Sequence, residues 1–151
     1  MEKHRAHRHP VENKRAFRNA LLKWFQENGK SYPWRETTDP WSILVSEIML
    51  QQTTVASVLA NRRFEKFLQE FPCIETIAAA SEKQILRAWE GLGYYNRVRN
   101  LQKTAQALLH DFEGQFPSDA QTLETLPGIG RYTAGAVSSF AFDKPAPIVD
   151  G

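Results

Sequence analysis

A single glutamate, Glu47, lies in the middle of an apolar segment, residues 43–50, with the sequence ILVSEIML. Helical spacing places Ile43, Leu44 and Leu50 on the same face as its carboxyl group. A helical glutamate usually forms a solvated salt bridge, but the large apolar neighbours make that explanation a poor fit here. Because burial raises the pKa of a carboxyl group, Glu47 is suited to act as a general acid near neutral pH.

A second carboxylate, Asp150, stands in the sequence PIVDG at residues 147–151. Taken alone, it is an ordinary turn or helix N-cap aspartate. It becomes a candidate for chemistry only together with the other motifs of the chain.

The sequence LPGIGRYTA, residues 126–134, has two glycines around one apolar residue, immediately before a predicted helix. Gly128 and Gly130 permit positive φ and close approach of the backbone. The free N–H groups of this turn and of the helix N-terminus suit an anion such as a DNA phosphate, whereas Ile129 packs back between the two helices. A plain helix–turn–helix corner is the better explanation for a bare Gly-x-Gly, so the argument depends on the longer string.

These residues need a helical framework, and the spacing of apolar residues is helical almost throughout the chain. Asp39-Pro40 predicts an N-cap followed by the first helical residue, and Ser81 followed by Gln84 predicts a capping box. No stretch alternates as a strand would, so we predict one all-α domain of many short helices. The predicted helices cover about residues 11–28, 40–50, 55–70, 74–79, 82–90, 94–112, 119–125 and 131–142.

The composition places the chain among globular proteins. Its 151 residues are 42% hydrophobic and 24% charged, which excludes a largely disordered chain. The one cysteine, Cys73, excludes an internal disulfide and an all-cysteine metal or iron–sulfur site within the chain. No apolar run approaches the roughly 20 residues that span a bilayer, and no signal peptide is recognisable, so we expect a cytoplasmic protein without a membrane partner.

Positive charge is concentrated at the N-terminus, where residues 1–18 have a formal charge of +4 against −2 for the remaining residues. The body of the chain is therefore not a broad basic surface, and we expect residues 1–16 to form a basic, disordered arm. We predict no metal-binding residues, because the histidines of this arm have no fixed geometry.

Three further strings stand in order among these motifs: YPWR at residues 32–35, MLQQT at 49–53 and GLGYY at 91–95. Together with SE at 46–47, the glycine turn and IVDG at 148–151, they resemble the adenine DNA glycosylases of the MutY type, within the helix-hairpin-helix superfamily that includes endonuclease III. The resemblance covers residues 17–151. It implies an all-α, multi-helix glycosylase domain, a monomer at the bacterial nucleoid, that removes adenine mispaired with 8-oxoguanine or guanine in double-stranded DNA.

The resemblance also implies roles for individual residues. Glu47 matches the catalytic glutamate that protonates adenine and later activates water, and Asp150 matches the aspartate that stabilises the sugar cation or bonds to it. Tyr132 matches a tyrosine that assists near the aspartate. The match assigns the adenine pocket to Trp34, Arg35 and Leu50, and DNA contacts to Gln51, Gln52, Thr53, Tyr94, Gly128, Ile129, Gly130, Arg131 and Thr133.

Two of these residues, Gln52 and Tyr94, are expected to enter the base stack when the target base is flipped out. Each assigned residue also has an ordinary explanation when it is taken singly. Trp34 and Leu50 would then be core residues, Tyr94 a helix-start aromatic and Gln52 a solvated helix-end residue. The combination of motifs favours the functional interpretation.

Tyr132 stands where the bifunctional endonuclease III enzymes have a lysine for Schiff-base chemistry. A phenol cannot form that adduct, so we predict a monofunctional glycosylase without efficient strand cleavage. A thymine-mismatch glycosylase of the same superfamily can also have tyrosine there, but the YPWR and QQT strings favour the adenine enzymes.

The family's catalytic domain normally continues past its Asp-Gly with further helices and four cysteines that bind a 4Fe–4S cluster, followed by a domain that reads 8-oxoguanine. None of these lies within the 151 residues, so the cluster ligands are expected to be absent and the domain incomplete at its C-terminus. We expect an uncovered apolar face around Trp24 and Phe25, and little or no turnover by these residues alone. A non-enzymatic helix-hairpin-helix DNA-binding remnant is the competing interpretation.

Overall fold

The computed structural model describes residues 13–148 and divides the chain into two compact units, residues 1–32 and 33–151. The described part of the first unit holds helix α1 (Lys14–Asn28), where the sequence predicts a helix over residues 11–28. The side-chain oxygen of Asn13 caps it by accepting a 3.0 Å hydrogen bond from the backbone N–H of Ala16. No residue of α1 is buried, and its large exposed apolar side chains are Phe17, Leu21, Leu22, Trp24 and Phe25.

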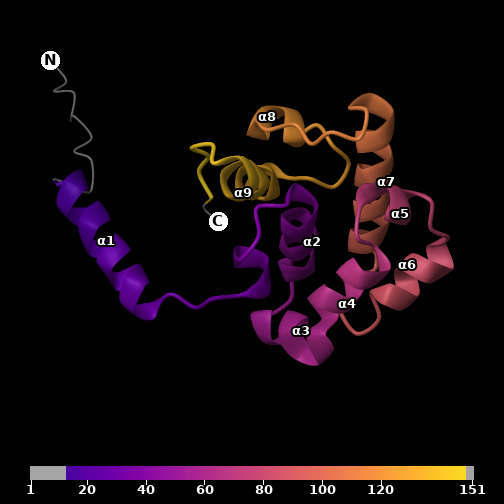
Figure 1. The fold of residues 1–151 in the computed structure, drawn as a ribbon, viewed down its shortest axis with the longest axis horizontal. Helices are drawn as coiled ribbons and strands as arrows, with labels where there is room; N and C mark the ends of the chain where they lie inside the picture. The colour runs from indigo at the N-terminus through magenta and orange to yellow at the C-terminus, as the bar shows by residue number, and fades with distance from the viewer. Residues whose placement is uncertain (1–12, 149–151) are drawn as a thin grey trace, which may run out of the picture. The chain divides into compact units, whose positions relative to one another are not determined.

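The second unit is all-α, as the sequence predicts, with no strand in residues 33–148 (Figure 1). None of the described helices of the chain is long and apolar enough to cross a membrane. In chain order the elements of this unit are η1 (Pro33–Arg35), α2 (Pro40–Leu50), α3 (Val55–Leu59), η2 (Ala60–Arg62), α4 (Arg63–Glu70), α5 (Ile74–Ala78), α6 (Glu82–Ala88), α7 (Asn96–Asp111), α8 (Ala120–Leu123) and α9 (Arg131–Phe142).

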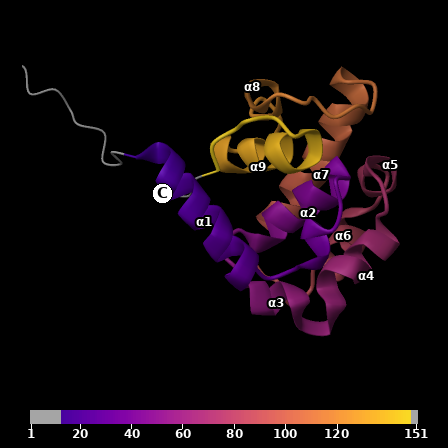
Figure 2. The ribbon, with the colours of Figure 1, turned by 60° about the vertical axis from the view of Figure 1, so that its left-hand side comes forward.

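Helix α2 forms the centre of this unit. It packs most extensively against α9 and also contacts α7, α4 and η1 (Figures 1 and 2). Trp41 and all of residues 43–49 are buried, as is typical of a helix that is apolar on every side. The predicted N-cap is confirmed, since the Asp39 carboxylate accepts a 2.8 Å hydrogen bond from the backbone N–H of Ser42. Glu47 is thereby held at a fixed position inside the unit.

One helix prediction is wrong, because residues 55–70 form α3, η2 and α4 in place of a single helix. The break occurs at Asn61 and Arg62, whose φ angles are 55° and 54°. Left-handed residues cannot continue a right-handed helix, and asparagine adopts this conformation more readily than most residues. No glycine or proline marks the break in the sequence, so the apolar spacing alone did not reveal it.

The turn before α7 shifts a second boundary. Gly91, Gly93 and Tyr94 have φ angles of 87°, 67° and 47°. These left-handed residues delay the start of α7 to Asn96, two residues later than the sequence predicts. Tyr94 therefore belongs to the turn and not to the helix.

Candidate active site

A hollow of about 400 Å³ lies between the C-terminal end of α2 and the N-terminal end of α9. All of its lining residues are among those that the sequence assigned to catalysis, the base pocket or DNA contacts. They are Arg35, Glu47, Leu50, Gln51, Gln52, Gly130, Arg131, Tyr132 and Thr133. A hydrogen bond of 3.3 Å from Gln51 Nε2 to Thr133 Oγ1 joins the two sides, which lie 82 positions apart in the sequence.

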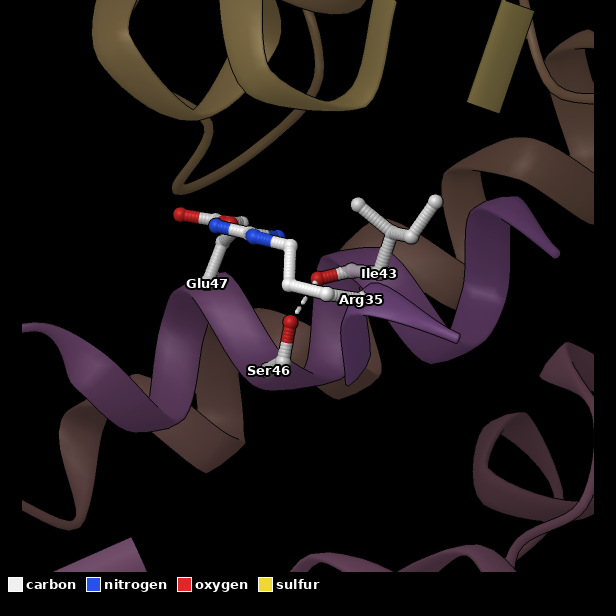
Figure 3. Close-up of polar contacts among 4 residues, drawn as sticks. All are labelled: Arg35, Ile43, Ser46 and Glu47. Atoms are coloured by element: carbon white, nitrogen blue, oxygen red, sulfur yellow. Dashed lines mark hydrogen bonds and ion pairs between the residues drawn. The ribbon is translucent and has the colours of Figure 1, made fainter. Parts of the chain in front are cut away.

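The carboxylate of Glu47 lines this hollow, and its side chain is only 2% exposed. Its Oε1 lies 3.0 Å from Nη2 of Arg35, a residue of η1 whose side chain is 29% exposed. The Arg35 guanidinium also lies over the ring of Phe140, 3.8 Å from the ring centroid. Figure 3 shows Arg35 and Glu47 meeting on the side of α2 that faces α9, while the Ser46 hydroxyl turns back toward the Ile43 carbonyl oxygen.

Burial raises the pKa of Glu47, and the charge and hydrogen bond of Arg35, which lower it, have a smaller combined effect. Glu47 therefore retains a proton at a higher pH than an exposed glutamate does. A buried acid that opens onto a hollow can donate this proton to a basic atom of a bound molecule. The sequence predicted the burial of Glu47, whereas its pairing with Arg35 appears only in the structure.

Replacing Arg35 with methionine is expected to raise the pKa of Glu47 further, because it removes both of the contributions that lower it. Ionised Glu47 would then lack a partner, so we expect a loss of about 2 kcal/mol of stability near pH 8 and a smaller loss near pH 5. Thermal unfolding at both pH values measures this. Arg87→Met, which removes the same charge from an exposed residue outside the hollow, is the control and should show no such pH dependence. Equal losses at both pH values would contradict the assigned pair.

The hairpin of α8, the turn 126–130 and α9 forms one wall of the site. Ile129 is 5% exposed and packs inward, as predicted. Gly128 has a φ of 74°, and a Cβ atom there would lie 2.7 Å from Cβ of Asn100 in α7. Gly130 uses neither of the freedoms that glycine permits, since its φ is −89° and a Cβ atom there would meet open space. The first N–H groups of α9 have no partner within the helix and can face an anion.

Four residues that the resemblance assigns to DNA contacts differ in how far they are exposed to solvent. Gln52 is exposed, whereas Thr53 is half-buried, and its hydroxyl donates to the Met49 carbonyl oxygen. Tyr94 is 62% exposed. Thr133 is 2% exposed, so only a small part of its surface remains for a DNA contact.

Trp34 does not line the hollow. Trp34 is 1% exposed and packs edge-on against Phe64, with 5.5 Å between ring centroids, so it supports the site from the core. Asp150 lies outside the described residues. Its assigned role therefore stays a prediction.

Two residues near the site were missed from the sequence. Phe140 is an unremarkable aromatic of α9 until its contact with Arg35 is seen. Arg97 resembles a solvated helix charge in the string NRVRN, yet it is 7% exposed and its guanidinium donates to the loop that carries Gln52. No pattern in the sequence marks either contact, because both join distant segments.

The iron–sulfur cluster implied by the sequence resemblance has no ligand set in these residues. Cys73 is the single cysteine of the sequence, and it lies half-buried at the N-cap of α5. Within residues 13–148, no group of three or more His, Cys, Asp or Glu side chains is arranged to hold a metal ion. The residues present therefore do not fit a cluster that takes four cysteine ligands.

Comparison with known proteins gives one family match and a consistent set of relatives. Residues 45–151 match the family described as HhH-GPD superfamily base excision DNA repair protein. Adenine DNA glycosylase of Rattus norvegicus is 40% identical over 145 residues, covering 90% of this chain and 28% of the rat protein. The Mycobacterium tuberculosis protein of the same name is 44% identical over 131 residues, covering 86% of this chain and 42% of that protein. The chain thus spans less than half of these relatives.

Solved structures share the fold. A thermostable thymine-DNA glycosylase aligns with a TM-score of 0.83 and 32% identity, covering 89% of this chain and 62% of its own. A trapped covalent intermediate of endonuclease III with DNA aligns with a TM-score of 0.76 and 27% identity, covering 93% of this chain and 65% of its own.

Proposed function

Because the chain belongs to the HhH-GPD superfamily of base excision DNA repair proteins, we propose that it acts in the removal of adenine mispaired with 8-oxoguanine or guanine in DNA. The observation that carries this proposal is the buried, Arg35-paired Glu47 in a hollow whose other wall is the hairpin. The names of the relatives that are 40% and 44% identical support the choice of adenine.

Glu47 would supply the proton for base release. Protonating the adenine makes it a better leaving group, so the bond between base and sugar breaks and leaves positive charge on the sugar. The ionised Glu47 can then take a proton from water as the water adds to the sugar. Arg35 favours this ionised state and keeps the carboxylate oriented. Asp150 is proposed to stabilise the sugar cation.

The product is expected to be an abasic site in an intact strand. Tyr132 lines the hollow, and by the sequence resemblance it matches the position where bifunctional endonuclease III enzymes have a lysine that forms a Schiff base with the sugar. A tyrosine hydroxyl cannot form that adduct. The proposed reaction is therefore hydrolysis without strand cleavage.

Contacts to DNA are proposed for both sides of the hollow. The turn of residues 126–130 and the N-terminus of α9 would bind phosphate through backbone N–H groups, which positions the duplex without reading its sequence. Arg131 is exposed there and adds positive charge. Gln52 and Tyr94, both exposed, would fill the space left in the base stack by the flipped base.

Two other functions remain candidates, each on a specific observation. The fold similarity to a thymine-DNA glycosylase, at a TM-score of 0.83, supports thymine as the excised base. The exposed glycine turn and the N-terminus of α9, which can bind phosphate without any chemistry, support a DNA-binding role without catalysis.

The test is base release from four duplexes, with adenine opposite 8-oxoguanine, guanine or thymine, and thymine opposite guanine. We expect the full-length protein to release adenine from the first two duplexes only, with strand breaks appearing only after alkali treatment. Preferential release of thymine would support the second candidate, and tight binding without release would support the third. Little turnover by the 151 residues alone stays a prediction, which the same assay measures.

A further inference from the structure

Two exposed loops carry the residues that are proposed to enter the base stack, and each holds its residue in the left-handed region. Gln52 has a φ of 53° and Tyr94 a φ of 47°. Residues other than glycine keep this conformation only where the surrounding structure holds them there. Some interaction must therefore fix the backbone of both loops.

One buried side chain, Arg97 of α7, bonds to both loops. Its Nη1 lies within hydrogen-bonding distance of four oxygen atoms around the end of α2: the carbonyl oxygens of Ile48 (2.9 Å), Met49 (2.9 Å) and Gln51, and the hydroxyl of Thr53 (3.1 Å). Its Nη2 donates to two carbonyl oxygens of the second loop, those of Leu92 (3.0 Å) and Gly93 (3.2 Å). The two ends of one guanidinium thus hold two segments about 40 positions apart in the sequence.

The charge of Arg97 is balanced by these loops and not by an acid. In the part of the chain that the structure describes, no carboxylate forms a salt bridge with Arg97. The carbonyl groups at the C-terminal end of α2 carry partial negative charge. The rings of Trp89 and Tyr94 add to this, with centroids 5.3 Å and 5.7 Å from Arg97 Cζ.

We propose that Arg97 is a positioning residue that fixes the spacing between Gln52 and Tyr94, so that both side chains can enter the DNA base stack together. The inference rests on the proposed function, because it assigns the two loops to DNA. Loops that are already held in their bound arrangement lose less conformational entropy when they bind. Arg97 would therefore strengthen DNA binding without touching the DNA.

Lysine cannot replace Arg97 in this role. It keeps the positive charge, but its single ammonium nitrogen cannot serve two loops as the planar fork of arginine does. In the free, full-length protein, we expect Arg97→Lys to speed hydrogen exchange about tenfold at the amides of residues 50–53 and of residues 91–94. Leu108→Ala, which changes a fully buried residue in the same helix, is the matched control. It should not speed hydrogen exchange at the amides of these two loops more than at other amides. If Arg97→Lys does not fold, Thr53→Val removes one acceptor and is measured in the same way.

A double-mutant cycle then tests the DNA step, with a duplex that contains adenine opposite 8-oxoguanine. We expect Arg97→Lys to raise the Kd about tenfold in the otherwise unchanged protein, but less than about twofold when Gln52→Ala and Tyr94→Ala are already present. Losses that simply add, or faster exchange of Arg97→Lys in one loop only, would overturn the proposal; for Thr53→Val, unchanged exchange at residues 50–53 would do so. If the unchanged protein does not bind the duplex, the proposed function fails and the DNA role of Arg97 fails with it; binding with additive losses contradicts the role of Arg97 alone.

Discussion

Replacing Glu47 with glutamine is expected to lower the rate of adenine release about 1,000-fold, while the affinity for the mismatched duplex stays within about threefold. Glutamine has nearly the shape of glutamate, and its carbonyl oxygen can still accept the hydrogen bond from Arg35. It has no acidic proton to give to the departing base. The proposed DNA contacts lie in the hairpin and loops, so binding should persist. Single-turnover excision and a binding titration on the same duplex separate the two effects.

The same substitution should change how stability depends on pH. Because burial raises the folded-state pKa of Glu47, its contribution to stability is fully present below the unfolded-state pKa and is lost as pH rises through the raised value. Glutamine does not ionise and shows no such loss. As the pH rises above the ordinary pKa of glutamate, the Tm of the unchanged protein should therefore fall relative to the Tm of Glu47→Gln.

A matched control for Glu47→Gln is Glu70→Gln, which makes the same change at an exposed residue of α4. It should alter neither the excision rate nor the pH dependence of Tm. An excision rate for Glu47→Gln within tenfold of that of the unchanged protein would show that another group supplies the proton.

The helical framework could be predicted because it depends on local patterns, whereas the residues of the site were predicted from the resemblance of the ordered motifs to a glycosylase family. The N-cap at Asp39, the capping box at Ser81 and the burial of Glu47 all follow from residue types at short spacing, and the structure confirms them. These local features depend on residues within about one or two helical turns of each other. The residues around the hollow come from motifs far apart in the sequence, and only the resemblance of the ordered motifs to a known family brought them together.

The features that escaped prediction depend on contacts between distant segments or on backbone conformation without a sequence marker. Arg35 of η1 pairs with Glu47 of α2, and Arg97 of α7 donates hydrogen bonds to two loops. The left-handed residues at Asn61 and Arg62 divide a helix whose apolar spacing runs on unbroken. Such contacts are set by packing of the whole unit, so a single sequence does not reveal them.

The two glycines of the hairpin look equivalent in the sequence, yet in the structure they differ in backbone conformation and in the space around them. Gly128 has a φ of 74° and no room for a Cβ atom beside Asn100, whereas Gly130 has an ordinary φ of −89° and open space beside it. An L-residue at position 128 would therefore be strained in the folded protein itself. At position 130, the side chain of an L-residue would lie in open space, beside the backbone N–H groups that are proposed to bind phosphate.

Gly128→Ala is accordingly expected to lower the free energy of unfolding by about 3 kcal/mol, from the left-handed conformation and the 2.7 Å approach of the new Cβ to Asn100 Cβ together. Gly130→Ala should lower the free energy of unfolding by only about 0.5–1 kcal/mol, because alanine is a poorer N-cap residue than glycine. Its methyl group would instead stand where a phosphate approaches, so its duplex affinity should fall about tenfold. Denaturant unfolding and duplex binding, measured on both variants, distinguish a structural from a DNA-contacting glycine. Equal losses of stability would contradict the conformations of the turn, and unchanged binding by Gly130→Ala would contradict phosphate contact at the N-terminus of α9.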